Sequence, residues 1–135
     1  MVFDGARAFR GLTPDLDLHC QRVVCSAEKM LMKPQMSWRQ IQGVCLKAVS
    51  KFPQGSELYI KPMFYCAEGF LLPDPSKTLF VLHVFKSPLP DEQSVSACFS
   101  SYVRSWPAMA PTDAKASCLY PNSQRAIHGG DAQGV

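Results

Sequence analysis

Two stretches with strand periodicity, residues 57–65 and 78–86, constrain the fold of this chain most strongly. In the first, ELYIKPMFY, every second side chain would lie on one apolar face: Leu58, Ile60, Pro62 and Phe64. Because proline lacks the N–H of a sheet hydrogen bond, Pro62 predicts a sheet edge or a bulge. The second stretch, TLFVLHVFK, contains the most apolar run of the chain and predicts a second strand.

Two predicted helices precede these strands. In residues 13–32, turn and cap residues Thr13 to Asp17 are followed by apolar side chains at helical spacing: Cys20, Val23, Val24, Ala27 and Leu31. In residues 37–52, the pair Ser37 and Gln40 forms a capping-box pattern. The same helix predicts a buried stripe of Ile41, Val44, Cys45, Ala48 and Phe52. A short strand at 2–9 completes a strand, helix, helix, strand, strand order.

The remaining third of the chain predicts the start of a second unit. A polar, proline-bearing link covers 87–93, a strand is expected at 94–104, and a helix begins at 121–128. These pieces cannot bury a core of their own. The sequence therefore predicts an α+β fold, with a small domain over 1–86, a linker over 87–93 and the beginning of a larger domain over 94–135.

Composition argues against several classes of partner. The net charge of the chain is only +3. Its 14 lysines and arginines are spread among 11 acidic residues, so the sequence predicts no basic surface for nucleic acid. The apolar run at 79–85 is too short to span a membrane. An acid and arginines stand where a signal peptide would be apolar, so a cytoplasmic protein without membrane or nucleic-acid partners is expected.

The six cysteines include no C-x-x-C pair. Cys20 and Cys45 fall on apolar helix faces, where free cysteine behaves as a small hydrophobic residue. Reduced core cysteines are expected, and no metal site. His19, His83 and His128 have no partner at ligand or triad spacing, so core or surface roles are favoured for them.

Lys115 lies in a run of small residues within APTDAKASCLYPNSQRA, residues 110–126. Its neighbours leave its amine close to the backbone, and Asp113 is the adjacent countercharge. A lysine that is partly removed from water can act as a neutral amine and bond to an aldehyde. The local composition alone favours an ordinary surface lysine, so other evidence is needed.

Four segments resemble the class IV pyridoxal-phosphate aminotransferases, the family of the branched-chain amino acid aminotransferases. They are VFDGARAF, DLHCQRVVCSAEKM, LYIKPMFY and PTDAKASCLYPNSQRA, in the family's order, and the likeness runs from Val2 to about His128. In the family, an Ala-Lys followed five residues later by tyrosine marks the lysine that carries pyridoxal 5'-phosphate. The resemblance implies this role for Lys115, with Tyr120 beside the cofactor.

Other positions carry implied roles. Arg22 matches the arginine that holds the cofactor phosphate, a contact for which a guanidinium fork is suited. A substrate pocket is implied for Phe3, Gly5, Tyr59, Lys61 and Tyr102, with Arg104 close to Tyr102. Where many branched-chain members have Tyr-Ile-Arg-Pro, this chain has YIKP. Lys61 keeps the charge without the fork, so the use of glutamate as amino donor stays open.

The resemblance implies transamination between amino acids and 2-oxo acids, with branched-chain amino acids first among the substrates. Two alternatives stay open: a lyase of the same superfamily that cleaves aminodeoxychorismate, and a residual fragment without activity. Members of the family are longer than this chain and are typically homodimers. The chain is therefore expected to be truncated at both ends and weakly active or inactive alone.

The segment Gly129 to Val135 departs from the family pattern. A shift of one base in a suitable coding sequence would restore a family-like continuation. This segment is therefore expected to be a frameshifted tail.

Overall fold

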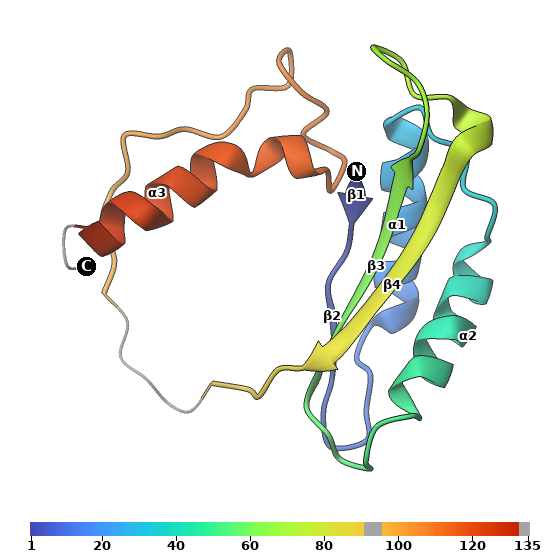
Figure 1. Ribbon diagram of the computed structural model, residues 1–135. Coiled ribbons are helices and arrows are strands. Elements are labelled where there is room, and N and C mark those ends of the chain that lie inside the picture. Colours follow the sequence, from blue (N-terminus) through green and yellow to red (C-terminus); the bar gives the residue numbers. More distant parts are fainter. Residues whose placement is uncertain (91–95, 133–135) are drawn as a thin grey trace.

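The computed structural model describes residues 1–90 and 96–132. Residues 1–86 form an antiparallel sheet that two helices cover on one face (Figure 1). The elements are β1 (Val2–Phe3), β2 (Ala6–Ala8), α1 (Leu16–Lys29), α2 (Trp38–Val49), β3 (Leu58–Cys66), β4 (Thr78–Lys86) and α3 (Pro121–Ala132). Two short 3-10 helices cover Pro75–Lys77 and Ser117–Leu119. The predicted α+β class and the two long strands are confirmed.

Strand β3 is the centre of the sheet. It pairs with β4 along its whole length, from Leu58 opposite Lys86 to Cys66 opposite Thr78, and β1 and β2 lie one after the other along its other side. The expectation that Pro62 marks a sheet edge or a bulge is therefore wrong. The Pro62 carbonyl accepts a hydrogen bond from the Asp4 N–H at 3.0 Å, so the missing N–H of Pro62 faces the break between β1 and β2.

The core lies between the sheet and α1, and α2 packs mainly against α1. Alternate side chains of β3 face it, as the two-residue period predicts, and Cys20 and Cys45 are buried in it as expected. All six cysteines are free. The fully buried residues of the core are Val2, Cys20, Val23, Ala27, Ile41, Cys45, Ile60 and Ala116. Ser37 and Gln40 form the predicted capping box at the start of α2.

Two residues predicted in the core are exposed instead. Helix α1 ends at Lys29, and Leu31 takes a φ of 59°, which turns the chain out of the helix and leaves its side chain exposed. Met32 enters the core in its place. In α2 the packed stripe runs through Trp38, Ile41, Cys45 and Val49, and Phe52 continues it just beyond the end of the helix. Val44 lies at the margin of that stripe and is exposed.

The strand predicted at 94–104 is not formed in its described part, residues 96–104. A strand needs a neighbour for its backbone hydrogen bonds, and no described segment pairs with this one. The side chains of Phe99 and Val103 consequently face solvent. Residues 91–93 of the expected linker lie outside the described residues.

Helix α3 extends the predicted helix start to Ala132 and runs away from the sheet (Figure 1). Gly129 to Ala132 of the expected tail are helical, and residues 133–135 lie outside the described part. Among the described helices, none has the length and apolar character needed to cross a membrane.

Candidate active site

The segment around Lys115 packs beside β1. Ala116 forms an isolated antiparallel bridge with Val2, and the Phe3 N–H donates to the Lys115 carbonyl at 3.2 Å. Ala114 and Ala116 are buried in the core, while Lys115 lies between them with the alternation of a strand. The small residues that flank the lysine therefore allow its backbone to approach the sheet closely.

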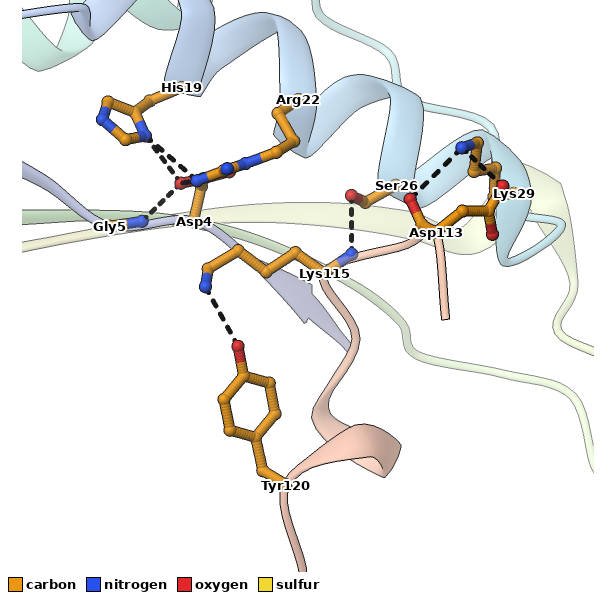
Figure 2. A network of polar contacts seen from close by, with 9 residues as sticks. All are labelled: Asp4, Gly5, His19, Arg22, Ser26, Lys29, Asp113, Lys115 and Tyr120. Atoms are coloured by element: carbon orange, nitrogen blue, oxygen red, sulfur yellow. Dashed lines mark hydrogen bonds and ion pairs between the residues drawn. The ribbon is translucent and has the colours of Figure 1, made fainter. Parts of the chain in front are cut away.

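Helix α1 fixes the same segment from a second side (Figure 2). The Lys115 N–H donates to the Ser26 hydroxyl at 2.9 Å, and Ser26 is buried. One turn further, Lys29 forms an ion pair with Asp113 at 2.6 Å and donates to its carbonyl at 3.2 Å. The hydrogen bond from Lys29 lowers the pKa of Asp113. Asp113 is therefore engaged by Lys29, although the sequence suggested it as the countercharge of Lys115.

The side chain of Lys115 meets two other residues that the sequence nominated, Tyr120 and Phe3. Its Nζ donates to the Tyr120 hydroxyl at 3.0 Å and lies 5.3 Å from the centre of the Phe3 ring. The Phe3 and Tyr120 rings are 5.3 Å apart, and Lys61 Nζ lies 4.7 Å from the Phe3 ring centre. Each of the two lysine amines thus lies within the roughly 6 Å range of a cation–π contact with the Phe3 ring.

Arg22 is held by a carboxylate that sequence reasoning missed. Arg22 Nε donates to Asp4 Oδ2 at 2.6 Å and Nη2 donates to Asp4 Oδ1 at 2.7 Å. His19 Nδ1 lies 2.9 Å from Asp4 Oδ1, and the Gly5 N–H donates to the same oxygen at 2.7 Å. Figure 2 shows these groups converging on Asp4. His19 has a polar partner in Asp4, which its sequence spacing did not reveal.

The pKa of Asp4 reflects two opposing effects. Burial by itself raises the pKa, but hydrogen bonds from Arg22, Gly5 and His19 outweigh it and hold the pKa below its ordinary value. The same pairing raises the pKa of the Arg22 guanidinium. Asp4 is therefore an ionised carboxylate, which can only accept hydrogen bonds, so His19 Nδ1 is the donor to Asp4 Oδ1.

A cavity of about 260 Å³ connects Lys115 with the arginine side chains, and its lining residues include Arg22, Arg104, Thr112, Lys115 and Tyr120. Its volume is just below the roughly 300–1,000 Å³ typical of small-molecule pockets. Two guanidinium groups, two hydroxyls and an amine suit an anionic ligand such as a phosphate that also carries an aldehyde, and the Asp113 carboxylate in the lining is paired with Lys29.

A larger cavity of about 380 Å³ lies at the turn between β2 and α1, where Phe9, Leu12, Val49 and Phe52 are among the lining residues. It has no titratable side chain to perform chemistry. The smaller cavity beside Lys115 is therefore the candidate active site. Among the described residues, no group of three or more histidines, cysteines or acids could hold a metal ion.

The sequence profile of the family described as "Amino-transferase class IV" matches residues 1–129. The chain belongs to this family. A protein of Rickettsia felis named "Probable branched-chain-amino-acid aminotransferase" is 27% identical over 125 residues, a match that covers 88% of this chain and 42% of the relative. The resemblance inferred from the four segments is thereby confirmed.

Solved structures of aminotransferases have the same fold. An aminotransferase from Brucella abortus bound to the cofactor PLP is 35% identical, with a TM-score of 0.93, and the match covers 98% of this chain and 49% of that one. A branched-chain aminotransferase from Thermoproteus uzoniensis is similar in fold, with a TM-score of 0.82 and 24% identity over 98% of this chain and 47% of that one. The chain thus spans about half the length of the relatives it matches.

The five residues expected to contact the substrate lie in two places: Phe3, Gly5, Tyr59 and Lys61 in or between strands of the sheet, and Tyr102 outside it. Tyr59 and Gly5 lie together, because a side chain on Gly5 would overlap the Tyr59 hydroxyl. The Tyr59 ring also packs against Phe85, with ring centres 5.5 Å apart. None of the five expected substrate residues is among those that line the Lys115 cavity. Tyr102 has its ring 5.7 Å from the Arg125 guanidinium.

Proposed function

We propose that this chain carries part of the active site of a pyridoxal-phosphate-dependent aminotransferase. The main observation is the position of Lys115, whose amine lies 3.0 Å from the Tyr120 hydroxyl in the cavity that Arg22 also lines. Arg22 would hold the cofactor phosphate, Lys115 would bind the cofactor covalently, and Tyr120 would contact it. When bound, pyridoxal phosphate supplies an electron sink for a substrate carbanion.

The residues of the chain divide the remaining work. Once released by the amino substrate, the Lys115 amine would move the proton at the substrate Cα. The Tyr120 hydroxyl would keep this amine in place, because the two are hydrogen-bonded. The Ser26 hydroxyl and β1 would hold the lysine backbone still, since both bind it directly. A fixed amine lowers the entropy cost of each proton transfer.

Branched-chain amino acids are the proposed amino substrates, with 2-oxo acids as products. The names of the relatives support this class. The residues proposed to contact the substrate are Phe3, Gly5, Tyr59, Lys61 and Tyr102. Lys61 would attract a carboxylate as a point charge, because its amine cannot form the double hydrogen bond of a guanidinium.

The proposal extends to domains and assembly. Residues 1–86 form the small domain in this proposal, 87–93 the linker and 94–135 the beginning of the large domain. In this division the cavity beside Lys115 would lie between the two domains, because Arg22 comes from the first part and Arg104 and Lys115 come from the second. Homodimers are proposed for the whole proteins that contain this unit.

A single-turnover assay tests the reaction. The chain is incubated with pyridoxal phosphate and L-leucine, and the 2-oxo acid and pyridoxamine phosphate are measured by chromatography. We expect both products in equal amounts, slowly, and at least about 100-fold less with Lys115→Ala, because loss of a general base typically costs that much. Lys51→Ala, a change at an exposed lysine on the opposite side of the unit, is the control. Equal product from Lys115→Ala and the unaltered chain would contradict the proposal.

A further inference from the structure

Asp4 is the most completely surrounded charged group in the described part of the candidate site. Its side chain is fully buried, and its two oxygens receive four donors: Arg22 Nε, Arg22 Nη2, the Gly5 N–H and His19 Nδ1. A buried charge costs free energy unless such donors compensate it. The backbone of Asp4 is fixed as well, since its N–H donates to the Pro62 carbonyl of the central strand.

The two partners of this ion pair differ in exposure. The Asp4 side chain has no exposed surface, whereas 54% of the Arg22 side chain is exposed. Asp4 binds Arg22 through Nε and Nη2, which lie along one edge of the guanidinium. The outer edge, formed by Nη1 and the second hydrogen of Nη2, has no hydrogen bond to any acceptor in the described residues. Arg22 also lines the cavity that contains Lys115.

A guanidinium has five N–H groups in one plane, so fixing one edge also fixes the direction of the other. We propose that Asp4, supported by His19, is the positioning residue that directs the outer edge of Arg22 toward the phosphate of the cofactor. This inference rests on the proposed function, because it assumes a phosphate-bearing ligand beside Arg22. It assigns a role to Asp4 and to His19, whose sequence spacing pointed to no partner.

The hydrogen-bond geometry also defines the tautomer of His19. Both His19 Nδ1 and Arg22 Nη2 reach Asp4 Oδ1, and the two nitrogens lie 3.3 Å apart. Since Asp4 is an acceptor, Nδ1 carries a hydrogen and cannot accept one from Arg22. His19 therefore supports Asp4 and does not bind Arg22 directly. Removing His19 is expected to weaken the orientation of Arg22 less than removing the charge of Asp4.

The test compares two aldehydes that differ only in the phosphate, pyridoxal phosphate and pyridoxal. Their dissociation constants are measured by absorbance for the unaltered chain, Asp4→Asn, His19→Ala and the control Asp74→Asn. Asp74 is an acid outside this cluster whose carboxylate binds Ser76. In Asp4→Asn the amide would present an N–H to the Arg22 Nε–H or Nη2–H, so the edge would lose its alignment.

We expect the unaltered chain to bind pyridoxal phosphate more tightly than pyridoxal. Asp4→Asn should reduce that preference about tenfold and His19→Ala about threefold, while pyridoxal itself binds within about twofold of the unaltered chain in each case. Asp74→Asn should keep the full preference. A change that only loosened the fold would weaken both aldehydes together, so the ratio separates positioning from stability.

A second measurement does not depend on the cofactor. In nitrogen-edited NMR spectra, the Arg22 Nε–H of the unaltered chain should be protected from exchange with water and should lose protection in Asp4→Asn but not in Asp74→Asn. Full phosphate preference in a folded Asp4→Asn chain, or an unprotected Nε–H in the unaltered chain, would overturn the inference. An unaltered chain that binds neither aldehyde would contradict the proposed function and the inference together. An Nε–H that is protected only when Asp4 is intact would support the positioning of Arg22 by Asp4.

Discussion

The Ser26 hydroxyl accepts a hydrogen bond from the Lys115 N–H at 2.9 Å, joining residues 89 positions apart in the sequence. Ser26 is buried on α1, and Ala114 and Ala116 on either side of the lysine are buried as well. The backbone of the candidate catalytic lysine is therefore held against the core between the sheet and α1. This contact explains how a chain of about half the family length can hold that lysine in a defined place.

Ser26→Ala should lower the free energy of unfolding by about 1–3 kcal/mol, because the Lys115 N–H would lose its partner in a buried setting. Urea unfolding at neutral pH measures the change. Ser50→Ala is the control, since Ser50 is exposed at the end of α2 and should change stability by no more than about 0.5 kcal/mol. Equal losses in the two variants would mean that the hydrogen bond contributes nothing specific.

Asp4 predicts an acid-sensitive fold. Its pKa is lower in the folded chain than its ordinary value of 3.8, so the ionised carboxylate stabilises the folded state above about pH 4. That stabilisation should be lost as the pH falls through the lowered pKa. Asp4→Asn should be less stable at pH 7 by about 1–3 kcal/mol.

Urea unfolding between pH 7 and pH 2.5 measures this dependence. The difference between the unaltered chain and Asp4→Asn should shrink as the pH falls below about 4, because both then lack the charge. Asp74→Asn serves as the comparison, since hydrogen bonds from Ser76 also lower the pKa of Asp74 but its side chain, unlike that of Asp4, is not buried. A stability difference for Asp4→Asn that stayed constant with pH would show that the Asp4 charge is not responsible.

Tyr120→Phe should slow the reaction of Lys115 with pyridoxal phosphate by about fivefold. The Tyr120 hydroxyl is the hydrogen-bond partner of Lys115 Nζ, and one such bond contributes about 1 kcal/mol. The rate is measured from the yield of reduced adduct at Lys115 after short incubations. Tyr65→Phe, a change on an exposed tyrosine of β3, should leave the rate unaltered. An unchanged rate in Tyr120→Phe would remove Tyr120 from the proposed site.

Gly5→Ala should destabilise the fold by about 1–3 kcal/mol, because the added methyl group would overlap the Tyr59 hydroxyl and force that ring to move. Thermal unfolding measures the effect. In the double variant Gly5→Ala/Tyr59→Leu the combined loss should be smaller than the sum of the single losses. Gly43→Ala in α2 has open space around the new methyl group and should stabilise the chain by up to about 1 kcal/mol. Additive losses at Gly5 and Tyr59 would contradict the close contact.

Several features of the fold were predictable because they depend on neighbouring residues. The alternation of β3 and β4 and the capping box of Ser37 and Gln40 follow from local spacing and hydrogen-bonding groups. Leu31 was mispredicted because a leucine rarely adopts a positive φ, and the turn that this φ makes brings Met32 into the core. Pro62 was mispredicted because the break between β1 and β2 removes the need for its N–H.

The site was predictable only in part. Lys115 and Tyr120 are close in the sequence, and their contact follows from one loop. Asp4 and Ser26 depend on the folded chain: Asp4 meets Arg22 18 residues away, and Ser26 meets Lys115 89 residues away. Such pairs have no spacing signature. The sequence did contain one signal for this pair. Asp4 directly follows Phe3, and a carboxylate that is buried beside a predicted pocket strand needs a cationic partner.

The central claim is that the docked lysine binds the cofactor, and covalent trapping tests it directly. The chain is incubated with pyridoxal phosphate and reduced with borohydride, and the modified peptides are identified by mass spectrometry. We expect Lys115 to carry most of the label at substoichiometric cofactor, and we expect Arg22→Gln to reduce this label while Arg39→Gln, on α2, does not. Label distributed over exposed lysines such as Lys47 and Lys51, with no preference for Lys115, would contradict it.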